Sequence, residues 1–329
     1  MTDRFSLLKA QGQKKNVPEN CREIISSLPK GQGWAAEHIY LYQGFWFDPV
    51  ILEGVIWAQQ SFRAIDTDIF LASSPKCGTT WLKALMFTIA NRKRYDSSSQ
   101  SHPLLTTSPH DCIPTLEILL DHDDPIAYLE SLPSSPRLIS THLSYTSLPN
   151  SILNADSGSR IVYITRNPKD ALVSLWVFSK AIRSENWNHL PPLPIQEACD
   201  LFCEGVSFAG PFWDHVLGYW KASLETPNKV LFLKYEDMKM DTQCWVKRLA
   251  DFMGHSFSLE EERQGVVQEI IKLCSFQNLT SLEVNKRAGN KEFFRRGEVG
   301  DSKNHLTPQM IKRLEEITEQ KLATSGLKF

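Results

Sequence analysis

Short β-type runs alternate with longer helical runs along most of this chain, and this alternation limits the folds that it can adopt. Runs of strand length occur at residues 69–73, 137–140, 160–165 and 229–234. Helical patterns occupy residues 79–91, 169–182, 243–253, 259–274 and 308–324. Strands separated by helices predict a parallel sheet that is covered by helices on both faces. We therefore predict one α/β domain with a central, mostly parallel sheet flanked by helices.

Two segments do not follow this alternation. Residues 1–35 are polar and carry the breakers Pro18, Pro29, Gly31 and Gly33, so we predict an N-terminal arm there and the domain over residues 36–329. Residues 185–194 contain three prolines and predict a long surface loop, a candidate lid.

Charge and composition exclude several classes of protein. The chain has 329 residues and a formal net charge of −2, which argues against a surface built to coat nucleic acid. Apolar residues make up 42% of the chain, which is enough to build a core and argues against disorder. The apolar runs are too short for a signal peptide or a membrane span, so we expect a cytoplasmic protein without a membrane partner.

The cysteines and histidines do not form a recognisable metal pattern. Seven cysteines are scattered along the chain without a C-x-x-C pair, which favours free thiols over disulfides or structural zinc. His102, His110 and His122 are interpreted as loop residues rather than a metal cluster. We expect no metal cofactor.

The strongest local signal is the segment 74–81, Ser-Pro-Lys-Cys-Gly-Thr-Thr-Trp, which joins the first predicted strand to the first predicted helix. A turn that opens onto a helix N-terminus directs free backbone N–H groups and the positive end of the helix dipole at a ligand. Gly78 allows close approach and Lys76 adds a cation, so the turn predicts an oxyanion site. The alternative is a tight βα turn capped by Thr79.

The order of residues in this turn excludes two common nucleotide sites. Lys76 precedes Gly78, whereas the Walker pattern places Lys directly after its last Gly, so an ATPase or a phosphoryl-transferring kinase is disfavoured. The chain also lacks the G-x-G-x-x-G fingerprint of dinucleotide-binding proteins.

The turn resembles the 5′-phosphosulfate turn of the soluble sulfotransferases, enzymes that use 3′-phosphoadenosine 5′-phosphosulfate (PAPS). Further motifs follow in the family's order: Arg166-Asn167-Pro168-Lys169-Asp170 with Ser174, Lys234-Tyr235-Glu236-Asp237, Leu273-Cys274-Ser275-Phe276 and Phe294-Arg295-Arg296-Gly297. The similarity runs from about residue 28 to residue 329. Segments 27–34, 210–215 and 282–286 resemble the plant branch in particular.

The resemblance implies a P-loop-kinase-like sulfotransferase fold and transfer of a sulfuryl group from PAPS to a hydroxyl of a small acceptor. It implies catalytic roles for Lys76, His142 and Ser174. It also assigns contacts with PAPS to Lys76, Cys77, Gly78, Thr79, Thr80, Trp81, Arg166, Ser174, Tyr235, Cys274, Phe276, Arg295, Arg296 and Gly297.

The residues themselves support a base at His142. Histidine is the side chain whose pKa is best matched to proton transfer at neutral pH. His142 follows the predicted strand 137–140, so it should lie at the carboxyl end of a strand, where ligands gather in open α/β sheets.

The chain departs from the family's usual residues at several positions. Cys77 replaces a usual Ser or Thr, Cys274 a usual Thr, Arg296 a usual Lys and Ser302 a usual Trp, and Ser140 replaces the usual Lys two residues before the base. These departures leave open a catalytically weakened or inactive nucleotide-binding homologue. We also expect a reactive Cys77 thiol, because a helix N-terminus and Lys76 should lower its pKa.

Partners are the least determined feature. The family's dimer motif fits at Lys303 and Thr307 but fails at Pro308 and Lys312, so we predict a monomer. The acceptor pocket is expected to use Phe45, Trp46, Pro109, His110, Trp176 and Phe178, which suit a lipophilic acceptor such as a flavonoid, a steroid or a related plant metabolite.

Overall fold

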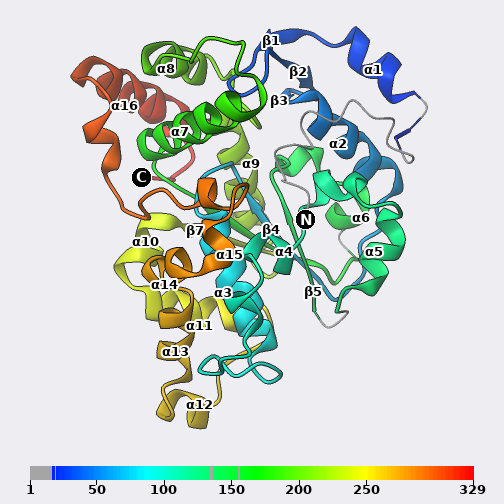
Figure 1. The fold of residues 1–329 in the computed structure, drawn as a ribbon, viewed down its shortest axis with the longest axis vertical. Coiled ribbons are helices and arrows are strands. Elements are labelled where there is room, and N and C mark those ends of the chain that lie inside the picture. The colour runs from blue at the N-terminus through cyan, green and yellow to red at the C-terminus, as the bar shows by residue number, and fades with distance from the viewer. Residues whose placement is uncertain (1–16, 19, 134–135, 155) are drawn as a thin grey trace.

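The structure is a computed structural model that describes residues 17, 18, 20–133, 136–154 and 156–329 (Figure 1). Much of the predicted N-terminal arm, residues 1–16 and 19, therefore lies outside the described residues. Among those that are described, no helix is both long enough and apolar enough to cross a membrane.

Four parallel strands form the central sheet, in the order β5-β4-β6-β7. They are β4 (Asp68–Ser73), β5 (Arg137–Thr141), β6 (Arg160–Thr165) and β7 (Val230–Lys234). The strand β4 lies between β5 and β6, with Ile69 opposite Leu138 on one side and Arg160 on the other. The predicted α/β fold and its parallel sheet are confirmed, and each predicted strand lies within one residue of its observed bounds.

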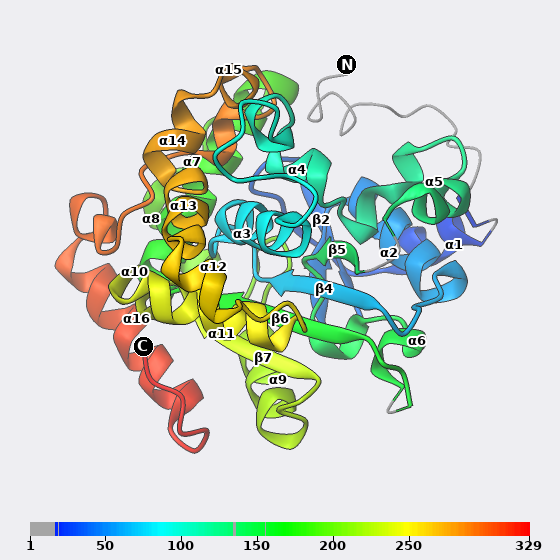
Figure 2. The ribbon, with the colours of Figure 1, turned by 90° about the horizontal axis from the view of Figure 1, so that it is seen from below.

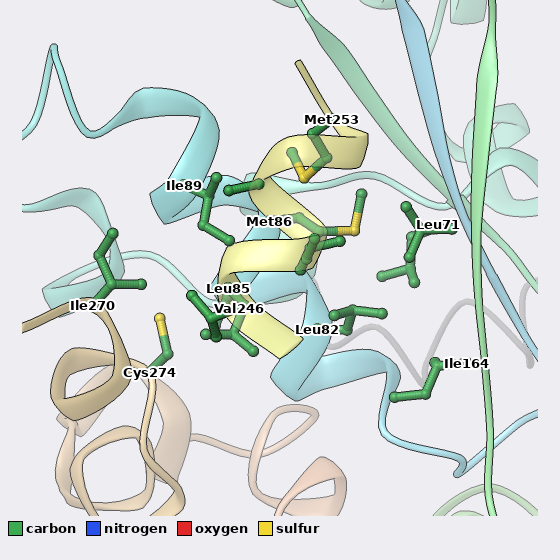
Figure 3. Packing of buried hydrophobic residues seen from close by; sticks show 14 of the residues in the cluster. Leu71, Leu82, Leu85, Met86, Ile89, Ile164, Val246, Met253, Ile270 and Cys274 are labelled. Atoms are coloured by element: carbon green, nitrogen blue, oxygen red, sulfur yellow. The ribbon is translucent and has the colours of Figure 1, made fainter. Parts of the chain in front are cut away.

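Helices cover both faces of this sheet (Figures 1 and 2). Alternate residues of β4 point to opposite faces, as expected for a strand of period two. Ile69 and Leu71 pack in one core with α3 (Thr79–Asn91), α11 (Thr242–Phe252) and α13 (Val266–Leu273), and Figure 3 shows part of this core. Phe70 and Ala72 pack in a second core with α2 (Pro49–Ser61) and α9 (Phe212–Glu225).

A third buried cluster lies beside the sheet, around α7 (Pro168–Asn186), α8 (Ile195–Cys203) and α16 (Pro308–Leu322). The remaining helices and helical turns are short: α1 (Cys21–Ser27), η2 (Pro103–Leu105), α4 (Pro109–Cys112), η3 (Leu116–Asp121), α5 (Pro125–Ser131), η4 (Tyr145–Ser147), α6 (Asn150–Leu153), α10 (Tyr235–Met240), α12 (Leu259–Arg263), α14 (Phe276–Ser281), α15 (Glu283–Lys286), η5 (Lys291–Phe293) and η6 (Asp301–Asn304).

A small antiparallel sheet, which the sequence patterns do not predict, packs near α2. It consists of β1 (Lys30–Gln32), β2 (His38–Tyr42) and β3 (Phe45–Phe47), in that order. The strand β1 belongs to the predicted arm and β2 to the predicted domain, so the described end of the arm is hydrogen-bonded to the domain.

One predicted helix is wrong. The run 259–274 is divided into α12 and α13, because Gly265 adopts φ +79° and interrupts the helical backbone. The predicted loop at 185–194 begins slightly later, since α7 continues to Asn186, and it leads into α8.

Candidate active site

The predicted oxyanion turn joins the end of β4 to the start of α3. Two of its residues have left-handed backbone conformations, Lys76 at φ +66° and Gly78 at φ +109°. A Cβ atom on Gly78 would lie 2.8 Å from the ring of Tyr235, so only glycine fits there without displacement of that ring. The non-glycine residue Lys76 is strained, as is common at functional sites.

A cavity of about 330 Å³ lies in front of this turn. It brings together thirteen of the predicted site residues from distant parts of the chain. These are Lys76, Gly78, Thr79, Thr80, Trp81, His142, Arg166, Ser174, Tyr235, Phe276, Arg295, Arg296 and Gly297.

The side chains of the two predicted cysteines do not line this cavity. Cys77 is fully buried, and burial raises the pKa of its thiol to about 12, which outweighs the lowering by Arg166. Cys274 is also fully buried, with its Sγ atom 3.5 Å from Oγ1 of Thr88 and its side chain in the core of Figure 3. The expectation of a reactive Cys77 thiol is therefore wrong, and any contact of these two residues with a ligand has to use the backbone.

Positive charge is concentrated at the cavity. The Lys76 Nζ atom lies 3.9 Å from the ring centroid of Phe178. Burial, with the nearby charges of Arg295 and Arg166, lowers the pKa of Lys76 to about 7. The Nε atoms of Arg166 and Arg295 are buried without a hydrogen-bond partner among the residues that the structure describes. Unsatisfied buried donors and crowded cations are what an anionic ligand would stabilise.

Asp170 connects the two segments that carry these arginines. Its carboxylate accepts hydrogen bonds from the Nη2 of Arg166 at 3.3 Å, from the backbone N–H of Gly300 at 2.6 Å and from that of Ser302 at 2.9 Å. Asp301 in turn accepts from the guanidinium groups of Arg295 and Arg296. Ser302 therefore anchors its segment through its backbone, although it lacks the large ring usual in the resembled family.

His142 follows the last residue of β5, as predicted from the sequence. Its Nδ1 atom lies 2.9 Å from the carbonyl oxygen of Ser73, which can only accept, so Nδ1 carries the proton and Nε2 has a lone pair. Burial lowers the pKa of His142 to about 4, which keeps the ring neutral at pH 7. The neutral ring can accept a proton at Nε2, whereas its pKa of about 4 lies below the value near neutrality that is optimal for a general base.

The backbone around His142 is held by buried groups that sequence reasoning missed. Glu117 accepts the backbone N–H of His142 at 2.6 Å and the hydroxyl of Thr141 at 2.9 Å. His215 lies 3.1 Å from the carbonyl oxygen of His142 through Nε2, and its Nδ1 lies 3.0 Å from the hydroxyl of Tyr163. Glu117 interrupts the apolar run 116–120, and that isolated charge is the signal that could have indicated its role.

A hydrogen-bonded chain leads from the core to the oxyanion turn, and it was also missed. Lys83 is buried, and its Nζ atom lies 3.2 Å from Nδ1 of His110. Because an ammonium group only donates, His110 accepts there and its Nε2–H donates to Oγ1 of Thr80 at 2.9 Å. This arrangement leaves the hydroxyl proton of Thr80 available to a ligand.

A second cavity, of about 180 Å³, meets the first. Both are lined by His110, His142, Phe178, Phe208 and Phe293. Of the six residues expected in an acceptor pocket, His110 and Phe178 line this cavity, but Phe45, Trp46, Pro109 and Trp176 line neither. Trp46, for example, packs on Gly31, and the indole N–H of Trp176 donates to the carbonyl of Leu193.

Comparisons with known proteins identify the family to which the chain belongs. A model of the Sulfotransferase domain family matches residues 66–326. The chain belongs to the sulfotransferase family. Its full length also aligns with cytosolic sulfotransferases 13 and 12 of Arabidopsis thaliana, which are 44% and 46% identical to it. Each alignment covers 96% of this chain and 95% of the relative.

Two solved sulfotransferase structures extend the similarity to three dimensions. A putative steroid sulphotransferase of Arabidopsis thaliana is 42% identical and superposes with a TM-score of 0.77 over 97% of this chain and 98% of its own. A mouse sulfotransferase complexed with PAP, the desulfated form of PAPS, is 28% identical to this chain. It has a TM-score of 0.66, over 88% of this chain and 95% of its own.

This sulfotransferase shows no metal centre in the part of the chain that the structure describes. No group of three or more His, Cys, Asp or Glu side chains there is arranged to hold a metal ion.

Proposed function

We propose that this sulfotransferase transfers the sulfuryl group of PAPS to a hydroxyl group of a small lipophilic acceptor, with His142 as the general base. The observation that carries the proposal is the position of His142, which lies where the cationic cavity meets the second, largely apolar cavity. A base at this junction can receive a proton from a hydroxyl in one cavity while the sulfuryl donor occupies the other.

The first cavity has the groups that PAPS requires. The N-terminus of α3, Lys76 and Thr80 would hold the 5′-phosphosulfate. Arg166, Ser174 and the segment 295–297 would hold the 3′-phosphate, and Trp81 and Phe276 offer aromatic faces to the adenine. The complex of the mouse relative with PAP supports PAPS as the co-substrate. PAPS, when bound, supplies an activated sulfuryl group.

The residues then divide the chemistry between them. Nε2 of His142 takes the proton of the acceptor hydroxyl as that oxygen becomes the nucleophile. Lys76 would stabilise the negative charge that develops on the 5′-phosphate oxygen as its bond to sulfur breaks and PAP leaves. Ser174, which is 5% exposed at the cavity, would position the phosphate groups. A metal ion has no assigned role.

The apolar and aromatic lining of the second cavity suits a flat or elongated lipophilic acceptor, of flavonoid or steroid type. Its walls include Ile39, Val50, Ile118, Leu175 and Ile182 together with three phenylalanines. The 42% identical Arabidopsis relative carries the name of a putative steroid sulphotransferase, which favours this class of acceptor. We further propose that the protein acts in the cytoplasm, as the names of its cytosolic relatives suggest. A monomer is proposed because the family's dimer motif fails at Pro308 and Lys312.

A transfer assay with radiolabelled PAPS and a panel of flavonols, steroids and other plant alcohols tests the proposal. Calorimetric titration with PAP, the desulfated cofactor, is run in parallel. Binding of PAP together with label transfer to one class of acceptor would support the enzyme. Binding of PAP without transfer to any of them would instead favour the inactive nucleotide-binding homologue.

A further inference from the structure

The second cavity is lined by a carboxyl group that has one buried oxygen without a hydrogen-bond partner among the described residues. Asp48 stands between β3 and α2 and lines this cavity. The buried oxygen is its Oδ1 atom. Asp48 also occupies the N-cap position of α2, yet its side chain accepts no hydrogen bond from the first turn of that helix. The side chain therefore does not cap α2, although an aspartate at the N-cap position usually caps its helix.

A buried carboxylate oxygen without a partner is costly, and Oδ1 of the partly exposed Asp48 is such an atom. A buried polar atom that loses its partner typically costs about 1–3 kcal/mol. Burial raises the pKa of Asp48 to about 7, which reflects the same cost. Nearby, Glu117 lines the same cavity but is satisfied by the backbone of His142 and the hydroxyl of Thr141. Asp48 therefore differs from Glu117, whose two carboxylate oxygens both accept hydrogen bonds within the protein.

The place of Asp48 in the cavity indicates which end of a ligand it would meet. His142 is among the residues shared with the first cavity, whereas Asp48 lines only the second. It lies beside apolar residues of α2, Val50 and Ile51, and the described residues that line this cavity include no Lys or Arg. An acceptor whose reacting hydroxyl is at His142 would extend into the second cavity, where Asp48 is one of the polar groups that it can meet.

We infer that Asp48 accepts a hydrogen bond from a second hydroxyl group of the acceptor, at the end remote from the hydroxyl that is sulfated. The inference rests on the proposed function and makes it more specific. The preferred acceptors are elongated apolar diols or polyphenols, and not monohydroxy compounds of the same shape. A hydroxyl at this end would satisfy Oδ1 whether the carboxyl is ionised or neutral.

The experiment uses a matched pair of acceptors, a rigid diol and its monomethyl ether at the remote oxygen. The full-length protein is compared with Asp48→Ala, with Asp48→Asn, which keeps an acceptor oxygen, and with Glu37→Gln, which changes an exposed carboxylate near the small sheet. We expect the wild type to prefer the diol by roughly tenfold or more in kcat/KM. The loss of one hydrogen bond to a charged group weakens binding by about that factor. Asp48→Ala should reduce the preference to about one, while Asp48→Asn retains part of it and Glu37→Gln retains all of it.

Equilibrium binding of the diol and the ether to the PAP complex provides the same comparison without turnover. An equal preference in the wild type and in Asp48→Ala, by rate or by binding, would overturn the subsite. Loss of sulfuryl transfer to every acceptor, with selective diol binding intact, would count against the proposed function and leave the subsite supported. Thermal unfolding of each variant checks that the fold is retained.

Discussion

His142 donates its Nδ1–H to the carbonyl oxygen of Ser73 over 2.9 Å. Ser73 is the last residue of β4, directly before the oxyanion turn, so one hydrogen bond links the proposed base to the strand that carries the proposed phosphosulfate site. The same bond fixes the tautomer of the ring and leaves Nε2 to accept a proton. A backbone carbonyl of the central sheet therefore orients the ring of the proposed base.

We predict that His142→Ala reduces kcat by roughly 10²–10⁴, the usual value of a positioned base, and leaves PAP affinity nearly unchanged. The reason is that His142 reaches the junction of the cavities, whereas the groups assigned to the phosphates are in the first cavity. Label transfer measures kcat and calorimetry measures the Kd of PAP. A variant with full transfer activity would remove His142 from the mechanism.

PAP binding should weaken as the pH rises through 7. The pKa of Lys76 is about 7 without a ligand, and a bound polyanion raises it, so binding takes up a proton above that pH. We expect the Kd to increase by up to about tenfold per pH unit above 7. Calorimetry between pH 6 and 9 tests this. Lys76→Arg, which keeps its charge, should flatten the profile, and an unchanged slope in that variant would contradict the assignment.

Asp170→Asn should weaken PAP binding by roughly tenfold or more. The change leaves Arg166 without its ion pair and replaces two hydrogen-bond acceptor oxygens of the segment 300–302 by an amide that has one. Calorimetry gives the Kd, and denaturant unfolding shows how much stability is lost. Asp237→Asn is the matched control, because it breaks a partly exposed ion pair with Lys234. Equal effects of the two substitutions on PAP binding would exclude a positioning role for Asp170.

Alkylation of the native protein should modify Cys244 and spare Cys77 and Cys274. Cys244 is exposed, whereas burial raises the pKa of each of the other two thiols to about 12. Mass spectrometry after treatment with iodoacetamide identifies the modified residues, and transfer activity should persist. Rapid modification of Cys77 that PAP prevents would show instead that the thiol is accessible from the cavity.

Gly78→Ala should abolish PAP binding and destabilise the fold by about 1–3 kcal/mol. The added methyl group would lie 2.8 Å from Tyr235 at a φ of +109°. Gly326→Ala provides the control, since Gly326 also has a positive φ, of +72°, but no heavy atom lies within 4 Å of an added Cβ. Binding of PAP by Gly78→Ala with normal affinity would show that the turn has more freedom than the structure indicates.

The sheet and the first cavity were largely predictable. The strands are short runs bounded by turn residues, and the oxyanion turn is contiguous in sequence, so local patterns indicate both. The ordered motifs that resemble the sulfotransferases then placed Arg166, Ser174 and Arg295 in the same site before any contact was known. The division of 259–274 at Gly265 was not predicted, although residues 260–264 are all polar and Gly265 is a helix breaker.

The acceptor side of the site was predicted poorly. Phe208 reaches the junction from a turn and Phe293 from the helical turn η5, and Asp48 follows the last strand of the small sheet. Single aromatic residues in the sequence do not reveal whether they face a core or a cavity. Of the residues that were expected in the pocket, Phe45 lies instead in the second core and Trp46 packs on Gly31 of the small sheet.

By itself, the sequence determined the parallel sheet, the oxyanion turn and the family, because strand length, turn residues and motif order are local properties of the chain. Only the tertiary structure decided that the Cys77 thiol is buried, that Lys83 supports Thr80 through His110, and that Asp48 lines the second cavity. These features depend on burial and on contacts between distant segments. Such quantities exist only after the helices have packed on the sheet.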